Sequence, residues 1–189
     1  MPAVADRPGG PAAGGSVLPA PSVALADRPL AFVKAQIDSL RALSEALDAL
    51  ADTGDARLTA IRAYLSARLL AVLQDRRANL LPLIRRRAAP EDRADRLADA
   101  LTATYDAIQA HAEALLAVLP EPGRTRSLPR HVLDPARTLA LNLRQMVSLE
   151  SSVLLSLLRV RLTEADQDLL AAAFQARREN WPGGTFQAR

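Results

Sequence analysis

The chain has 189 residues and no cysteine, which excludes disulfides and thiolate metal sites. Hydrophobic residues make up 49% of it and aromatic residues only 3%, because most of the apolar content is alanine and leucine, both strong helix formers. A formal net charge of +3 is no nucleic-acid footprint by itself, and no apolar run approaches the roughly 18 residues of a membrane span. We therefore expect an all-α, cytoplasmic protein that binds neither nucleic acid nor a membrane.

The first segment, residues 1–26, is rich in proline, alanine and glycine and lacks the basic start and apolar core of a signal peptide. We expect it to be a disordered extension. A first helix is predicted from Pro29 to about Ala51 and a second from about Ala56 to Arg87. Pro82 lies inside the second helix and should kink it or start a tighter last segment.

A third helix is predicted to begin at Pro90 and to reach about Leu119, followed by one long loop. Asp134-Pro135 predicts the cap and first turn of a fourth helix, and Thr163 to Asp166 a capping box for a shorter fifth helix. Four long helices with mostly short connections predict an up-down-up-down antiparallel four-helix bundle. The predicted domain covers residues 27–179, and residues 180–189 are predicted to be a flexible tail.

The apolar stripe of the fourth helix contains one carboxylate. Glu150 lies in the seam formed by Leu139, Leu143, Met146, Val153 and Leu157. A lone buried carboxylate costs several kcal/mol unless a cation, a metal or strong donors compensate it.

Polar residues in the middle of the other stripes could compensate Glu150. Arg76 lies one turn after Val72, and Tyr105 and Gln109 lie one turn apart, so these three and Glu150 are predicted to meet in the core. The alternative is that helix rotation brings one or both of Arg76 and Glu150 to the surface. For Tyr105 we expect a buried, hydrogen-bonded hydroxyl, with a redox or ligand role as the alternative. For Met146 we expect core packing, with metal or haem ligation as the alternative.

Three stretches carry a family resemblance: Phe32 to Gln36, Leu80 to Arg93, and Leu149 to Asp166. Over about residues 29–179 the chain resembles bacterial hemerythrin-like (HHE cation-binding) domains. The resemblance implies a four-helix bundle with a di-iron centre held by histidines and carboxylates. The positions of those ligands are occupied here by Ile37, Val72, Arg76, Tyr105, Gln109, Met146 and Glu150.

Only Glu150 keeps a ligand type of that family. Of the two histidines in the chain, His111 is predicted to face outward and His131 lies in the long loop. One carboxylate cannot hold two irons, so we expect no cofactor. The resemblance implies a vestigial centre in which the Arg76 guanidinium replaces the charge of the metal.

Arginines gather at one predicted pole, where the second and fourth helices end: Arg85, Arg86, Arg87, Arg159 and Arg161. They either complement the helix dipoles or form an anion pole for an acidic partner, a phosphate or nucleic acid, although the basic stripe along a helix that groove reading usually needs is absent.

The chain is therefore expected to be no enzyme but a regulatory, structural or partner-binding module that has lost its di-iron site. Its protein partner and oligomeric state are left open. The alternative is residual binding of a metal ion or small ligand, since Ile37, Val72 and Met146 could leave an apolar pocket in the core.

Overall fold

The computed structural model describes residues 18–19, 22–52, 54–121, 123 and 127–179, and every regular element in this part of the chain is helical. The all-α prediction is confirmed. The α-helices are α1 Pro29–Asp48, α2 Asp55–Ala63, α3 Leu69–Asp75, α4 Leu81–Arg87, α5 Ala94–Val118, α6 Arg130–Leu149, α7 Leu155–Arg161 and α8 Glu164–Glu179. Three π-helical segments (η3 Tyr64–Arg68, η4 Arg76–Leu80 and η6 Glu150–Leu154) and three 3₁₀ turns (η1 Val23–Leu25, η2 Leu50–Asp52 and η5 Pro90–Asp92) complete the list.

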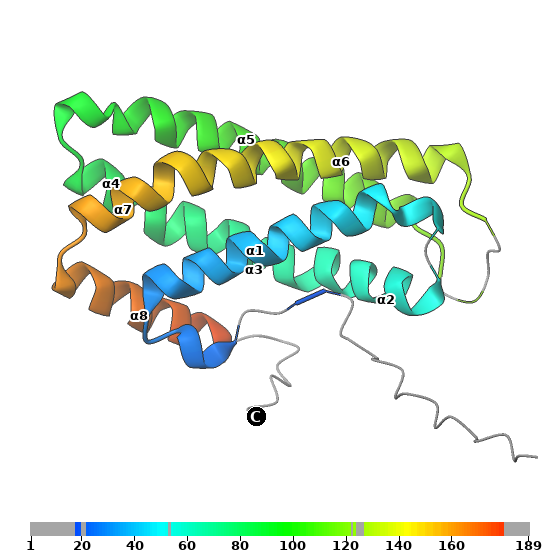
Figure 1. The fold of residues 1–189 in the computed structure, drawn as a ribbon, viewed down its shortest axis with the longest axis horizontal. Helices are drawn as coiled ribbons and strands as arrows, with labels where there is room; N and C mark the ends of the chain where they lie inside the picture. Colours follow the sequence, from blue (N-terminus) through cyan, green and yellow to red (C-terminus); the bar gives the residue numbers. More distant parts are fainter. Residues whose placement is uncertain (1–17, 20–21, 53, 122, 124–126, 180–189) are drawn as a thin grey trace, which may run out of the picture.

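The helices lie roughly along one long axis (Figure 1). α6 packs against both α1 and α5, while the run from α2 through α4 packs against α1 and α5. The α4–α5 and α7–α8 turns lie at one end, and the α1–α2 connection and the loop before α6 lie at the other (Figure 1). The core between them is built mainly from leucine and includes Ile37, Tyr105 and Met146.

π segments join the α-helices within two long helical runs, from α2 to α4 and from α6 to α7. In η6 the amide of Leu155 bonds to the carbonyl of Glu150, five residues back, so this turn holds more residues than an α turn. The inward face shifts as a result. Leu154 and Leu158 are buried, whereas Val153 is 38% exposed, so the prediction that Val153 faces inward is wrong. Leu157 is only half-buried.

The start of α6 differs from the prediction that Asp134 caps the helix. The helix begins at Arg130, because Pro129 is extended and its carbonyl accepts from the amides of Val132 and Leu133 at 3.0 and 3.2 Å. Val132 is 1% exposed, and its burial favours this extra turn. Pro135 consequently lies inside the helix rather than at its first position.

Two other helix boundaries also differ from the sequence prediction. The third helix begins at Ala94 rather than Pro90, because Pro90–Asp92 forms a 3₁₀ turn and Arg93 adopts a left-handed conformation with φ 50°. The last segment of the second helix, Leu81–Arg87, which contains Pro82, is a regular α-helix and not a tighter one, and the wide π turn η4 precedes it. Because proline has no N–H to donate, the regular α ladder is interrupted near this point.

The folded part begins before the predicted boundary at residue 27. Leu18 is 3% exposed, and the Pro19 carbonyl accepts a hydrogen bond from the Ser39 hydroxyl at 2.6 Å. This contact extends the core beyond the predicted domain, because Leu18 packs in the same cluster as α1. The remainder of the predicted extension, residues 1–17 and 20–21, and the predicted tail, residues 180–189, lie outside the described residues.

The fifth helix, α8, opens with the predicted capping box. The Asp166 amide donates to the Thr163 hydroxyl at 3.2 Å, and the Thr163 amide donates to Asp166 Oδ2 at 3.1 Å. α8 then packs beside α1, with the rings of Phe174 and Phe32 5.4 Å apart. It therefore covers a second face of α1, which a simple amphipathic helix would leave exposed.

Candidate functional site

The centre of the molecule contains a buried ion pair. Arg76 opens η4 and Glu150 opens η6, and both side chains are 0% exposed. The guanidinium meets the carboxylate with two bonds, from Nε to Oε1 at 3.2 Å and from Nη2 to Oε2 at 3.1 Å. Such a bidentate pair fixes orientation as well as charge. The alternative in which one or both side chains reach the surface is excluded by this geometry.

Tyr105 and Gln36 complete the bonding of the pair. The Tyr105 hydroxyl donates to Glu150 Oε1 at 2.8 Å, and Arg76 Nη1 donates to Gln36 Oε1. Burial, followed by the negative charge of Glu150, raises the pKa of Tyr105, so the phenol keeps its proton and donates it. Burial disfavours the charge on Arg76, but the attraction of Glu150 and the hydrogen bonds to it prevail, and the pKa of Arg76 is raised.

A second ion pair continues the network toward the surface. Gln36 Nε2 donates to Asp75 Oδ2 at 3.1 Å, and Arg177 Nε of α8 donates to Asp75 Oδ1 at 2.6 Å. Asp75 is buried, whereas the Arg177 side chain is 27% exposed. The network therefore runs from Glu150 through Arg76, Gln36 and Asp75 to α8. It holds two cations and two anions, so its charges balance.

The other predicted positions divide into two groups. Ile37, Val72 and Met146 are 1%, 5% and 1% exposed and belong to the apolar core. Gln109 is only half-buried and bonds with Arg77 and Glu113, at 2.9 and 3.0 Å, so the prediction that it joins the central cluster is wrong.

The cause of that difference lies in the spacing of α5. Its buried side chains follow one another in steps of four and three residues: Ala94, Ala98, Leu101, Tyr105, Ile108, Ala112 and Leu115. Ile108 rather than Gln109 follows Tyr105 on this face. Gln109 is turned by one residue toward the surface, where it meets Arg77.

Sequence reasoning missed Gln36, Asp75 and Arg177. A signal for Gln36 was available, because Phe32, Gln36, Ser39 and Leu43 form a second stripe on α1 with helical spacing. All four are buried because α8 and the segment around Pro19 cover that face. Asp75 lies three positions after the core residue Val72, so it could have been placed on the same face. Its partner Arg177 lies on α8, and the spacing of residues along one helix does not show which residues of another helix come close.

The residues at the centre do not fit the two irons that the family resemblance implies. Both oxygens of Glu150, the one carboxylate at the seven expected ligand positions, already accept from Arg76. Ile37, Val72 and Met146 offer no nitrogen or oxygen donor, and the guanidinium would repel a cation. Among the described residues, no group of three or more histidine and acidic side chains could hold a metal ion.

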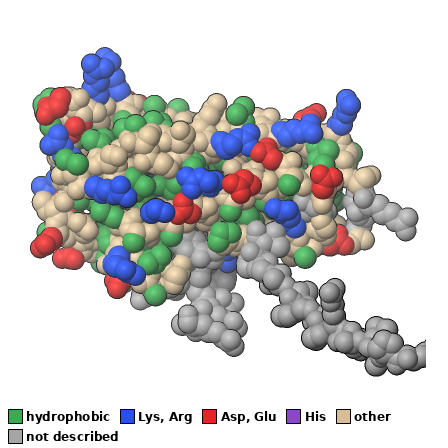
Figure 2. All heavy atoms as spheres, viewed as in Figure 1, with side chains coloured by type: hydrophobic (Ala, Val, Ile, Leu, Met, Phe, Trp, Pro, Cys, Tyr) green, Lys and Arg blue, Asp and Glu red, His purple; other side chains and the backbone are tan. Residues whose placement is uncertain are grey.

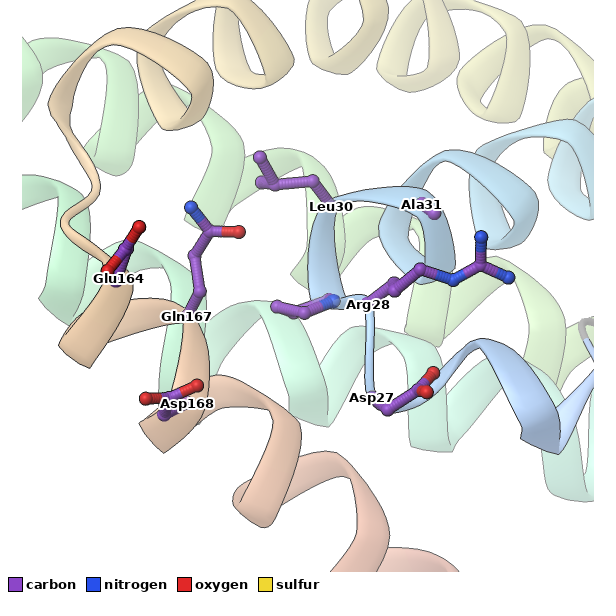
Figure 3. A pocket seen from close by; sticks show the side chains of 8 residues that line it. Asp27, Arg28, Leu30, Ala31, Glu164, Gln167 and Asp168 are labelled. Atoms are coloured by element: carbon purple, nitrogen blue, oxygen red, sulfur yellow. The ribbon is translucent and has the colours of Figure 1, made fainter.

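A separate hollow of about 410 Å³, lined by three acidic side chains and by Arg28, lies between the start of α1 and α8. Asp27 lies on one side of it, and Glu164, Gln167 and Asp168 of α8 lie on the other (Figure 3). The three carboxylates point in different directions and do not converge on one position (Figure 3). This hollow therefore lacks the converging oxygen ligands that a metal ion requires.

The predicted anion pole is largely paired within the molecule. Arg86 and Arg87 bond to Asp166 at 3.3 and 3.0 Å, and Arg161 bonds to Asp92 at 2.7 Å. The hydrogen bond from Arg87 lowers the pKa of the Asp166 carboxyl, and that from Arg161 lowers the pKa of Asp92. These arginines connect α4 to α8 and α7 to η5.

The other two arginines of that pole differ from each other. Arg85 reaches Asp99 at 2.5 Å, whereas Arg159 is exposed and makes no ion pair with any described residue. The five arginines therefore do not form one free cationic surface.

No protein-family model, curated protein or solved structure matches this chain. The hemerythrin-like resemblance stays a prediction from the sequence. Among the residues described, no helix has both the length and the apolar character needed to cross a membrane.

Proposed function

We propose that this protein is a hemerythrin-like four-helix bundle in which the Arg76–Glu150 ion pair replaces the di-iron centre. It acts as a non-catalytic regulatory, structural or partner-binding module. The observation that carries the proposal is the bidentate contact between these two fully buried side chains, with Tyr105 on the same carboxylate. An arginine in that place supplies the positive charge that a metal supplies in the family.

The arrangement of the helices supports the bundle. Four helical runs follow one another: α1, α2 through α4, α5, and α6 through α7. Each packs against the run before it or after it, and α6 returns to pack against α1. Sequential neighbours that pack with turns at alternate ends are typical of an up-down-up-down topology (Figure 1).

The chemistry of the centre supports a non-catalytic role. Each charged group of the pair is bonded to its counterpart, Tyr105 retains its proton, and all three are shielded from solvent. A catalytic acid or base needs access to substrate and a proton that it can exchange near the working pH. This centre offers neither, whereas a satisfied polar network in a core favours one unique packing of the helices.

Outward-facing apolar side chains support partner binding. The π segment η6 turns Val153 outward, and Val160, seven residues later on the same helical run, is 74% exposed. Leu169 on α8 is 64% exposed. Exposed apolar side chains at helical spacing provide contact area for another protein.

Metal analysis of the purified protein tests the proposal directly. We expect no stoichiometric iron, manganese or zinc after treatment with a chelator. Stoichiometric metal that survives the chelator and disappears in Glu150→Ala would refute the replacement of the centre.

A restored variant tests the relation to the family. Ile37→His, Val72→His, Arg76→Glu, Tyr105→His and Met146→His together reintroduce the ligand types that the resemblance implies. We expect this variant, with Glu150 intact, to bind iron, and the same variant with Glu150→Ala to bind much less. Failure of a folded, helical restored variant to bind any iron would show that these positions are not a former metal site.

A further inference from the structure

A hollow of about 600 Å³ lies where α4 turns into α5. Three arginines line it, Arg85 from the end of α4, Arg93 from the turn and Arg96 from the first turn of α5. Asp95 is the one acidic residue in the lining. The three guanidinium groups outnumber the two carboxylates that pair with Arg85, those of Asp95 and Asp99, so the hollow carries a net positive charge. On the face drawn in Figure 2, basic side chains project from the end of the molecule where α5 begins, with acidic side chains beside them.

The arginines of this hollow differ from those of the predicted anion pole in their partners. Arg85 is shared between Asp99 at 2.5 Å and Asp95 at 3.6 Å. Arg93 and Arg96 are exposed and make no ion pair with any described residue. Two of the three cations are therefore free to bind an external anion.

The backbone amides at the start of α5 add further hydrogen-bond donors and positive potential to the hollow. Arg93 is the N-cap residue of the long helix α5, and its side chain makes no capping bond. The first amides of a helix have no intrahelical acceptor, and the helix dipole places partial positive charge there. A carboxylate or small polar residue is the ordinary occupant of such a position, whereas an arginine adds like charge to it. An anion in the hollow would relieve that repulsion.

The same molecule illustrates how such a set of donors holds an anion. At the start of α8 the Asp166 carboxylate accepts from Arg86, Arg87 and the Thr163 amide. There the chain provides its own carboxylate. The hollow at α5 has guanidinium groups as well, but Asp95 is the one carboxylate in its lining. Asp95 lies 3.6 Å from Arg85, farther than Asp99 at 2.5 Å, and does not pair with Arg93 or Arg96.

We infer that this hollow binds the phosphate group of a small soluble phosphate monoester. A phosphate monoester carries a charge of about −1.5 to −2 near neutral pH, which complements the two unpaired guanidinium groups of Arg93 and Arg96. Planar guanidinium groups bind phosphate oxygens with paired hydrogen bonds. The site shares no residue with the Arg76–Glu150 centre, so it goes beyond the proposed function and is independent of it.

Calorimetric titration tests the inference with three probes at physiological ionic strength, about 0.15 M, where diffuse attraction is screened. The probes are inorganic phosphate, AMP as a soluble monoester, and adenosine as its phosphate-free counterpart. We expect saturable binding of phosphate and of AMP at one site, and none of adenosine. The inference is overturned if neither phosphate nor AMP saturates the protein at about 10 mM, because binding is then weaker than a millimolar dissociation constant.

Three variants locate the binding. Arg93→Asn and Arg96→Gln should each weaken AMP binding about tenfold, because each loses one charge-assisted contact. Arg159→Gln is the matched control, since Arg159 is another exposed arginine without an ion pair among the described residues, but it lies outside the hollow. It should leave binding unchanged. An equal loss in Arg159→Gln would mean that binding is a diffuse charge effect and would overturn the site.

Thermal unfolding separates binding from structure. Arg93→Asn should unfold at the same or a higher temperature than the wild type without ligand, because asparagine tolerates the left-handed backbone and caps helices well. A variant that keeps its stability but loses AMP binding supports a binding role for Arg93. If the protein co-sediments with phosphatidic acid vesicles but does not bind AMP, the site binds a lipid headgroup, and the inference of a soluble ligand is refuted.

Discussion

Arg76→Ala removes the cation that neutralises the buried carboxylate of Glu150. Three contacts disappear together, two to Glu150 and one to Gln36. Glu150 then keeps one hydrogen bond, from Tyr105, in a position that is 0% exposed. Because the charge has no route to solvent, the variant must hold an uncompensated carboxylate in the core or protonate it.

The expected loss is about 3–5 kcal/mol of unfolding free energy, the usual cost of removing one partner of a buried pair. Domains of this kind have about 5–15 kcal/mol in total, so the variant should remain folded but lose a large share of its stability.

Urea unfolding followed by circular dichroism measures the change, with the slope checked for constancy between variants. Arg77→Ala is the matched control, because Arg77 is the next residue and also pairs with a carboxylate, that of Asp106 at 2.7 Å. That pair is at the surface, with side chains 28% and 66% exposed, so its loss should cost about 0–1 kcal/mol.

The double variant Arg76→Met with Glu150→Leu completes the cycle. Replacing both charges by apolar side chains of similar size should recover most of the stability lost in Arg76→Ala. Equal, small effects of Arg76→Ala, Arg77→Ala and the double variant would refute the reasoning, because they would mean that the Arg76–Glu150 pair is not buried in solution.

Three further predictions concern the neighbours of the pair and α8. Tyr105→Phe should lower the unfolding free energy by about 1.5–3 kcal/mol in urea unfolding, because it removes a hydrogen bond to a charged group while Glu150 stays paired. Arg177→Ala strands the buried Asp75, so amide hydrogen exchange should accelerate in α8 and much less in α5; equal acceleration in both would contradict a local role. The pKa of Asp166 is lowered in the folded state, so its stabilisation is present above the ordinary aspartate value of 3.8 and is lost as the pH falls below it. Asp166→Asn should therefore unfold at a lower temperature than wild type at pH 7, and the difference should shrink steadily as the pH falls from about 4 toward 2; a difference that does not shrink over this range would mean that the charge is not its source.

The helices could be predicted from composition and from the spacing of apolar residues, because these decide how favourable the helical conformation is in each stretch of the chain. The alanine- and leucine-rich stretches predicted helical runs that the structure contains, and Thr163 with Asp166 predicted the start of α8. Local signals failed where two of them competed. Asp134-Pro135 carries a strong start signal, but burial of Val132 favours a helix that begins one turn earlier.

The candidate site was predictable where one residue alone posed a physical problem. Glu150 in an apolar seam required a counter-charge, and Arg76 was the cation at matching height on another helix. Gln109 was predicted wrongly because a four-residue step from Tyr105 is as regular as the three-residue step to Ile108, which the structure uses. Only packing distinguishes these two steps.

By itself, the sequence determined that the chain is helical, where its long helical runs lie and that Glu150 needs a partner, because these follow from properties of neighbouring residues. The tertiary structure decided which partner each buried charge has. It joined Asp75 to Arg177, 102 residues apart in the chain, and it turned Val153 outward through the π segment that begins at Glu150. Such contacts depend on how helices rotate and pack against one another, and that depends on every side chain in the core at once.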